Sequence, residues 1–115
     1  MSLAVESKEQ KGVTVVAVRG RLIMQYGAKL QDEVKRRVGE GARRVLVDMT
    51  EVEYIDSYGL GQMVACMKTL GEQKGKIRFA GLTDKVKKLI DISAVYKILD
   101  LDPDLRTGLS RIGGS

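Results

Sequence analysis

Apolar residues near the start of the chain come in short runs, with polar residues between them. The run Val13–Val18 has five apolar residues in six positions, which is typical of a strand that is covered on both faces. Residues 3–9 predict a weaker strand, and the intervening Lys11–Gly12 predicts the turn of a hairpin. Gly20 is expected to end the second strand.

A first helix is predicted from about Tyr26, where apolar residues begin to recur at helical spacing. Its apolar positions lie four residues apart, at Leu30, Val34 and Val38. Glycine suits the left-handed residue that follows many helices, so Gly39–Gly41 is expected to end this one. A short buried strand at 43–48 and a polar loop at 50–53 are expected next.

A second helix is expected to begin near Ser57 and to end at Gly71–Gly75. Its apolar stripe follows one helix face: Leu60, Met63, Val64, Met67 and Leu70. A strand at 76–80 follows, and Thr83 is a natural N-cap for a third helix. The apolar face of that helix consists of Val86, Leu89 and Ile90.

The last part of the chain predicts an edge strand at 98–99 and a final helix from Asp104 to about Ile112. Pro103 would occupy its first helical position, and 113–115 would be a flexible tail. With no linker or repeat, we expect one domain over 1–115, with its core at about 3–112.

The alternation of strands and helices predicts an α/β fold. Its sheet would be mixed and mostly parallel, with four or five strands, an initial antiparallel pair and about four flanking helices. Ligands and partners of such sheets collect at the carboxyl ends of the strands, which correspond here to Gly20–Tyr26 and Asp48–Gly61.

Composition narrows the chemistry that this fold could carry. The chain has no histidine, no tryptophan and one cysteine, Cys66, and aromatic residues make up only 4%. Zinc sites, histidine general bases and intrachain disulfides are therefore disfavoured, as is base stacking on single-stranded nucleic acid. Carboxylate chemistry, hydroxyl chemistry or binding remain, and we expect no cofactor and no metal.

Two further patterns bear on partners and location. The net charge is +5, but basic and acidic residues alternate, as in Asp32–Arg37, which favours solvated helix faces over a nucleic-acid surface. No apolar run approaches the ~20 residues of a membrane span, and the first residues lack the pattern of a secretory signal. We therefore expect a cytoplasmic protein of bacterial type that does not insert into membranes.

The segment Ile55–Gly61 is the strongest candidate for function. A structural interpretation makes Asp56 or Ser57 the N-cap of the helix and uses Gly59 and Gly61 for close packing on the sheet. A functional interpretation places an exposed hydroxyl at the positive end of a helix, where a phosphate is favoured. The chain lacks a nucleotide-binding phosphate loop, and Ser57 has no histidine to activate it as a hydrolase nucleophile.

Other candidates have simpler explanations. Cys66 is expected to be a half-buried thiol rather than a redox switch. Acids in the loops are expected to face solvent rather than to bind magnesium: Asp48, Glu51, Glu53 and Asp56. Acids near Pro103 are explained as helix-start charges: Asp100, Asp102 and Asp104. An exposed loop either contacts a partner or covers the end of the sheet: Met24, Gln25 and Tyr26.

Residues Val45–Gly61 resemble the signature of the STAS domain, a family that contains the bacterial anti-sigma factor antagonists. The shared pattern is an apolar strand, an aspartate, a short loop, an apolar pair, Asp-Ser, one variable residue and Gly-Leu-Gly. The order of elements over nearly the whole chain is similar too. The resemblance implies a STAS-like fold with the α/β layout predicted above.

The resemblance also implies a function, that of a switched binding module without catalysis. A partner that is both anti-sigma factor and serine-protein kinase would phosphorylate Ser57. The unphosphorylated domain would bind this partner and free the sigma factor, and a metal-dependent serine phosphatase would restore that form. Such a phosphoprotein regulates transcription without binding nucleic acid. Beside Ser57, we expect partner contacts from Met24, Gln25, Asp56, Tyr58, Gly59 and Leu60.

Two departures from the family pattern leave alternatives open. The residue after Ser57 is often small in the family but is Tyr58 here, and the Gly-x-Leu-Asp loop of many antagonists reads Gly20–Ile23 without its carboxylate. A second interpretation is therefore a STAS scaffold, or a small subunit of a lipid or anion transport complex, that is not phosphorylated. A third is a small enzyme or nucleotide binder that uses Asp56 and Ser57. The lack of histidine and of a phosphate loop argues against the third.

Overall fold

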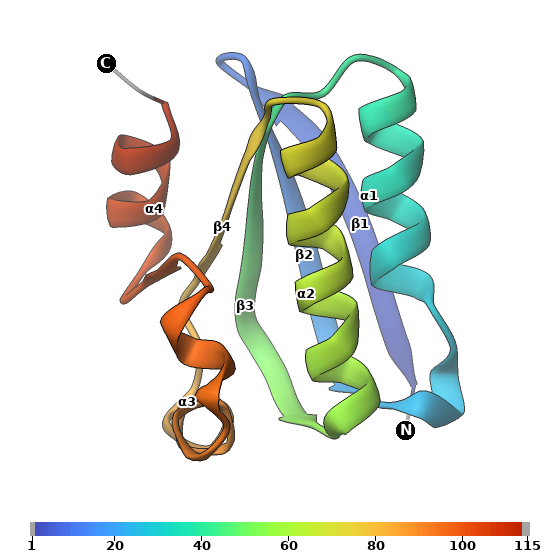
Figure 1. The fold of residues 1–115 in the computed structure, drawn as a ribbon, viewed down its shortest axis with the longest axis vertical. Coiled ribbons are helices and arrows are strands. Elements are labelled where there is room, and N and C mark those ends of the chain that lie inside the picture. Colours follow the sequence, from blue (N-terminus) through green and yellow to red (C-terminus); the bar gives the residue numbers. More distant parts are fainter. Residues whose placement is uncertain (1, 114–115) are drawn as a thin grey trace.

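The computed structural model describes residues 2–113, which form a five-stranded sheet with helices packed on both faces (Figure 1). In chain order its elements are β1 (Leu3–Gln10), β2 (Val13–Leu22), the 3-10 helix η1 (Met24–Tyr26), α1 (Lys29–Gly39), β3 (Arg44–Ile55), α2 (Ser57–Glu72), β4 (Lys76–Ala80), α3 (Asp84–Ile92), the 3-10 helix η2 (Ala94–Lys97), β5 (Leu101–Asp102) and α4 (Leu105–Ile112).

The strands lie in the order β1-β2-β3-β4-β5, so each is paired with its neighbour in the chain. β1 runs antiparallel to β2, whereas the pairs β2–β3, β3–β4 and β4–β5 are parallel. The predicted α/β fold with an initial antiparallel pair is thus confirmed. Because four strands run in one direction, their carboxyl ends meet at one edge of the sheet and their amino ends at the other.

The period-two alternation of strands divides the apolar residues between two cores. One face, with Val16, Val47 and Phe79 among its residues, packs against α1, α2 and α3. The other face, with Val15 and Leu46, packs against α4. The prediction that residues 13–18 form a strand covered on both faces is therefore confirmed.

The strands that lead to the carboxyl edge are longer than predicted. β2 does not end at Gly20, which has φ 105° and lies beside a shift in register, but continues to Leu22. The predicted loop at 50–53 is part of β3. β4 pairs with β3 only at Arg44–Asp48, so the rest of β3 projects past it, and polar residues reach solvent there while Val52 stays buried.

The helices also differ in detail from the expectation. Residues 24–26 form η1, and α1 begins only at Lys29. α2 passes Gly71 and ends at Glu72, and it is rotated from the predicted stripe, because Gly59 and Cys66 face the core. Cys66 is therefore wholly buried rather than half-buried, and this burial raises the pKa of its thiol to about 12.

At the C-terminal end, the short edge strand is β5 at 101–102 rather than 98–99. Pro103 lies outside α4, before its N-cap Asp104, whose carboxylate accepts a hydrogen bond from the Thr107 N–H at 2.8 Å. Residues 114–115 of the predicted tail lie outside the described residues.

Asp102 is a buried carboxylate rather than a helix-start charge, so the prediction for this residue was wrong. Its oxygens accept hydrogen bonds from Arg78 Nε at 2.7 Å and from Arg111 at 2.8 Å. Burial raises the pKa of Asp102, but the hydrogen bonds and charges of Arg78 and Arg111 outweigh it, so the pKa lies below its usual value. The carboxylate thereby joins β4, β5 and α4.

We expect Asp102→Asn to destabilise the protein by about 2–4 kcal/mol, because it removes the buried carboxylate that two guanidinium groups share; Arg78 then keeps only the longer ion pair with Asp100, at 3.9 Å. Since the folded pKa of Asp102 is lowered, its contribution is present above the usual carboxyl pKa of about 4 and is lost as pH falls toward the folded value. Urea denaturation between neutral and acid pH should therefore show a flatter acid limb for the variant.

Asp104→Asn is the matched control, because asparagine also caps helices and Asp104 is exposed. At neutral pH its denaturation midpoint should stay close to that of the wild type. Equal midpoints for Asp102→Asn and the wild type at neutral pH would contradict the structural role of this carboxylate.

Candidate functional site

The candidate site lies where β2 and β3 end, at the lower end of the molecule in Figure 1. Leu22 and Ile55 are partners in the parallel register of these strands. The segments that leave the sheet after them, which lead to η1 and to α2, therefore begin side by side. This is the carboxyl edge at which the sequence placed both candidate segments.

Asp56 connects the two segments through one carboxylate. Its Oδ1 accepts the backbone N–H of Gly59 at 2.8 Å and so caps the first turn of α2. Its Oδ2 accepts the backbone N–H of Met24 at 3.0 Å and so holds the start of η1. Of the two N-cap candidates in the sequence, the structure selects Asp56.

Gly59 allows α2 to approach the end of β2 closely. A Cβ atom at this position would lie 1.9 Å from the Leu22 carbonyl oxygen, far inside contact distance, whereas a Cβ at Gly61 would meet nothing within 4 Å. Close packing thus explains the first glycine and not the second. Gly59 is also buried, so it positions the helix and does not offer a surface.

Gln62 supports the same arrangement from inside the protein. Its buried side-chain amide accepts the Gln31 N–H at 3.2 Å and donates to the Gly27 carbonyl at 3.0 Å. Both partners follow η1, so α2 holds this segment at two points, through Asp56 and through Gln62. Sequence reasoning missed Gln62, whose only signal was a polar residue directly beside the apolar stripe.

Ser57 is the first residue of α2 and is exposed. Within residues 2–113, its hydroxyl forms no hydrogen bond with another residue. It lies at the helix N-terminus, where free backbone N–H groups carry partial positive charge. The hydroxyl borders a shallow depression of about 310 Å³, which is lined by Tyr54, Ile55, Asp56, Ser57, Leu60, Leu89, Ile92 and Ser93.

Apolar side chains near Ser57 are unusually exposed. Met24 is 67% exposed, Tyr58 38% and Ile92, at the end of α3, 84%. The sequence predicted the first two as partner contacts, together with the exposed Gln25 and the half-buried Leu60. It missed Ile92, although this residue falls off the apolar face of its helix and so could have been recognised as facing solvent.

Positive charge lies against Tyr54, one of the residues that line the depression. Arg21 and Lys85 both lie over the ring of Tyr54, at 5.5 and 5.4 Å from its centre. Arg21 comes from the end of β2 and Lys85 from the first turn of α3. The site therefore combines a free hydroxyl, exposed apolar groups, the Asp56 carboxylate and two nearby cations.

The acids considered for a metal site do not gather. Asp48 accepts hydrogen bonds from the N–H and hydroxyl of Thr50, and Glu51 pairs with Arg19 at 3.2 Å. Among residues 2–113, no group of three His, Cys, Asp or Glu side chains could hold a metal ion. None of the helices formed by these residues has the length and apolar character of a membrane span.

The fold and the site together define a class of protein, an α/β domain whose Asp-Ser pair begins a helix at the carboxyl edge of the sheet. Comparison with known families identifies the class, since the STAS domain matches residues 4–108. The chain belongs to the STAS domain family, as the sequence predicted.

Relatives and solved structures agree with this assignment. An anti-sigma-B factor antagonist of Staphylococcus aureus is 26% identical over 102 residues, which span 89% of this chain and 94% of the relative. The crystal structure of an anti-sigma factor antagonist from Mycobacterium paratuberculosis superposes with a TM-score of 0.87 at 23% identity, covering 97% and 95% of the two chains. The Bacillus cell fate determinant SpoIIAA in its phosphorylated form has a TM-score of 0.71 at 15% identity, with 95% and 99% covered.

The two glycines of α2 provide a test of how the site is built. We expect Gly59→Ala to destabilise the protein by about 2–4 kcal/mol, because the added methyl group must push α2 away from Leu22. Gly61→Ala should instead stabilise it by about 0.5–1 kcal/mol, since alanine is the better helix former and has open space there. Chemical denaturation of both variants measures the difference. Similar effects of the two substitutions would contradict the close approach.

Proposed function

We propose that this protein is an anti-sigma factor antagonist that is switched by phosphorylation of Ser57. In this proposal, the unphosphorylated form binds an anti-sigma factor that is also a serine-protein kinase and so frees a sigma factor. Phosphorylation of Ser57 releases the partner, and a metal-dependent serine phosphatase reverses the modification. The family membership and the names of the relatives support the general role of an antagonist.

The observation that carries the proposal is the free hydroxyl of Ser57. A protein kinase must reach the hydroxyl, and this one is exposed at the start of a helix and has no hydrogen-bond partner among residues 2–113. Both oxygens of the adjacent Asp56 are already occupied by backbone N–H groups. The carboxylate therefore shapes the site while the hydroxyl remains available.

The surface around Ser57 has the composition of a protein interface. Exposed Met24, Tyr58 and Ile92 provide apolar and aromatic contact area, the kind of residue that often dominates binding energy. They come from η1, α2 and α3, so a partner that covers Ser57 would contact all three elements. Asp56, Gln25 and Leu60 complete the proposed contact surface, and Gly59 contributes by positioning α2.

A phosphate on Ser57 should change partner affinity far more than it changes folding. It adds roughly −1.5 to −2 charge next to Asp56. In an exposed site, repulsion over ~5 Å costs about 1–3 kcal/mol per charge pair, and the helix N-terminus returns about 0.3–1 kcal/mol. Salt screening, and the positive charges of Arg21 and Lys85 over Tyr54, reduce the net repulsion further. Inside an interface that fits a bare hydroxyl, the same charge costs several kcal/mol.

Substitutions at Ser57 test the switch. Ser57→Ala should keep partner binding because only a small hydroxyl is lost. Phosphorylation of Ser57 should lower partner affinity about 100-fold or more. Ser57→Asp should also weaken binding, but by less, because it adds only one charge. Affinities for the partner anti-sigma factor can be measured by calorimetry. The modified residue can be located by mass spectrometry after the protein has been incubated with this partner and ATP.

Ser110→Asp is the matched control, since this serine is exposed on α4, away from the site. It should leave affinity unchanged, and the thermal melts of all variants should lie close together. Equal affinities of the wild type, Ser57→Ala and Ser57→Asp would reject the switch in favour of an unswitched binding module.

The missing loop carboxylate gives a second test. Ile23 precedes Met24, whose N–H is bound by Asp56, so position 23 lies at the same edge as Ser57. A carboxylate there can accept the proton that the serine hydroxyl loses on phosphorylation. We expect Ile23→Asp to raise the rate of Ser57 phosphorylation and Ile23→Asn to leave it unchanged. Equal rates for the two variants, with folding intact, would show that position 23 has no part in the modification.

A further inference from the structure

We propose that the end of the protein opposite Ser57 adsorbs to membranes that contain anionic lipid. Five exposed cations form this surface, which we call the amino-end surface: Lys11, Arg43, Arg44, Lys74 and Lys76. The proposal concerns a second site and does not depend on phosphorylation of Ser57 or on the identity of its partner.

The topology of the sheet brings these cations together. β2, β3 and β4 are parallel, so the turns that precede them meet at one edge, and all five residues lie in those turns or at the strand starts. The Lys76 N–H donates to the Arg43 carbonyl at 2.8 Å. Arg44 and Lys76 are partners in the β3–β4 register, so two cations sit directly beside each other.

No carboxylate of the described residues neutralises this surface by an ion pair. Arg43 donates to the carbonyls of Val38 and Ala42, and Arg44 donates to that of Gly113. These contacts orient the guanidinium groups but leave their charge uncompensated. Neighbouring like charges on adjacent strands are unfavourable, so an anionic partner would relieve a repulsion that the fold contains.

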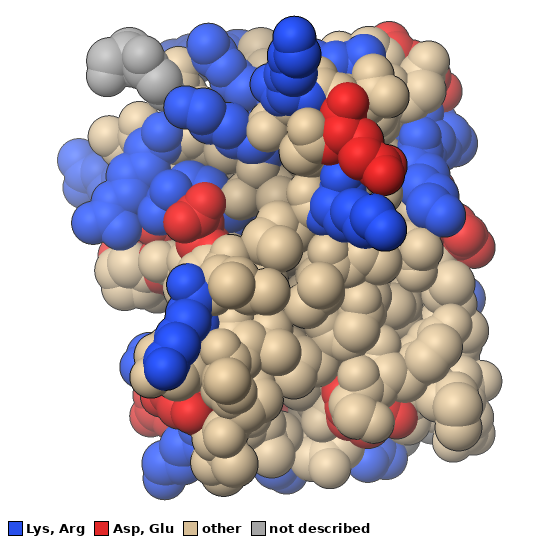
Figure 2. Space-filling view, viewed as in Figure 1, with Lys and Arg blue, Asp and Glu red and all other residues tan. Residues whose placement is uncertain are grey.

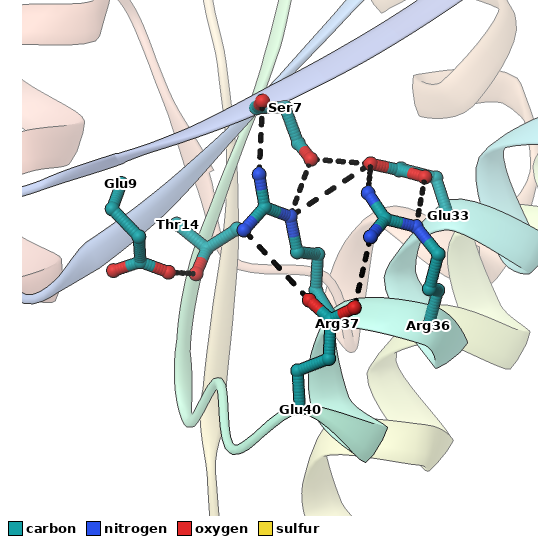
Figure 3. A network of polar contacts seen from close by, with 7 residues as sticks. All are labelled: Ser7, Glu9, Thr14, Glu33, Arg36, Arg37 and Glu40. Atoms are coloured by element: carbon teal, nitrogen blue, oxygen red, sulfur yellow. Dashed lines mark hydrogen bonds and ion pairs between the residues drawn. The ribbon is translucent and has the colours of Figure 1, made fainter.

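Six cations elsewhere differ from those of this surface. Ion pairs with carboxylates are formed by Arg19, Arg36, Arg37, Arg78, Lys87 and Arg111. Two acids, Glu9 and Glu40, line a hollow together with Arg43 and Arg44. Glu40 is engaged by Arg36 and Arg37, Glu9 accepts the Thr14 hydroxyl, and Glu33 binds Ser7 and Arg36 (Figure 3). Those carboxylates therefore already have partners on α1, β1 and β2.

The distribution of charge is visible on the surface. Figure 2 shows most of the Lys and Arg of this face over the end where α1 and α2 terminate and beside α4, with fewer Asp and Glu among them, while the middle of the face is mostly uncharged. The molecule is 32 Å long, and screening in physiological salt acts within about 8 Å. The amino-end surface can thus attract an anionic surface while salt screens the interaction from the Ser57 edge.

A lipid surface fits these observations better than nucleic acid does. The four tyrosines lie on η1, β3, α2 and η2, and none belongs to the turns or strand starts that form the surface, so it offers no stacking platform. α1 and α2 end there, so the helix N-termini that commonly bind phosphates point to the opposite edge. Clusters of four to eight Lys or Arg, by contrast, are typical of electrostatic binding to anionic bilayers.

Binding of this kind would orient the protein. With the amino-end surface on the bilayer, the carboxyl edge with Ser57 faces the aqueous phase, where a protein partner can reach it. No large apolar side chain belongs to the surface, so adsorption is electrostatic and reversible by salt, in keeping with the expectation that the protein does not insert.

Vesicle sedimentation provides the test, with phosphatidylglycerol mixed into phosphatidylcholine at about 0.1 M salt. The first variant combines Lys11→Asn, Lys74→Asn and Lys76→Gln. Asparagine tolerates the left-handed backbone of Lys11 and Lys74, with φ 52° and 59°, so this variant should fold. The control combines Lys87→Gln, Lys88→Gln and Lys97→Gln on α3 and η2, and it has the same net charge.

At about fivefold per cation, the amino-end variant should lose about 100-fold in vesicle partitioning, whereas the control should stay close to wild type. Pure phosphatidylcholine or high salt should abolish binding for all three proteins. Equal losses in both variants would assign adsorption to net charge and overturn the proposal. The proposal would also be overturned if the wild type did not bind the vesicles. It would be overturned as well if the wild type bound duplex DNA more tightly than vesicles and the amino-end variant lost this DNA binding. Circular dichroism and thermal melts verify that both variants are folded.

Discussion

One carboxylate organises the functional edge of this protein. Asp56 accepts a backbone N–H from α2 with one oxygen and a backbone N–H from η1 with the other. The arrangement is possible because Gly59 lets the helix approach the Leu22 carbonyl at the end of β2. Without that approach, the two segments that leave the sheet would not share a ligand. The position of Ser57, one residue along, follows from this connection.

The parallel topology also aligns the dipoles of α1 and α2, so the two edges of the sheet differ in the charge that they favour. After β2 and β3 the chain turns back in α1 and α2, so helix N-termini gather at the carboxyl edge and helix C-termini at the amino edge. Helix N-termini favour anions and C-termini favour cations. The proposed phosphate acceptor at one edge and the proposed amino-end surface at the other are both consistent with this preference. The fold can thus carry two sites of opposite preference without interference between them.

Much of the fold could be predicted because it depends on local periodicity. The hairpin, the order of elements and the caps at Asp56 and Thr83 are all expressed in short stretches of sequence. The length of β3 could not be predicted, because its polar end is a strand only where β2 pairs with it. The buried face of α2 could not be predicted either, because the small residues Gly59 and Cys66 lie on it and do not stand out as part of an apolar stripe.

For the site, the sequence by itself determined which residues are chemically able to act: an Asp-Ser pair at a helix start, with no histidine and no phosphate loop. Only the tertiary structure decided that Ser57 is free, that Gly59 is buried and that Ile92 joins the same surface from α3. It likewise decided that Asp102 is a buried partner of two arginines. Residue type and local spacing are properties of the chain, whereas burial and hydrogen-bond partners depend on segments that meet only in the folded protein.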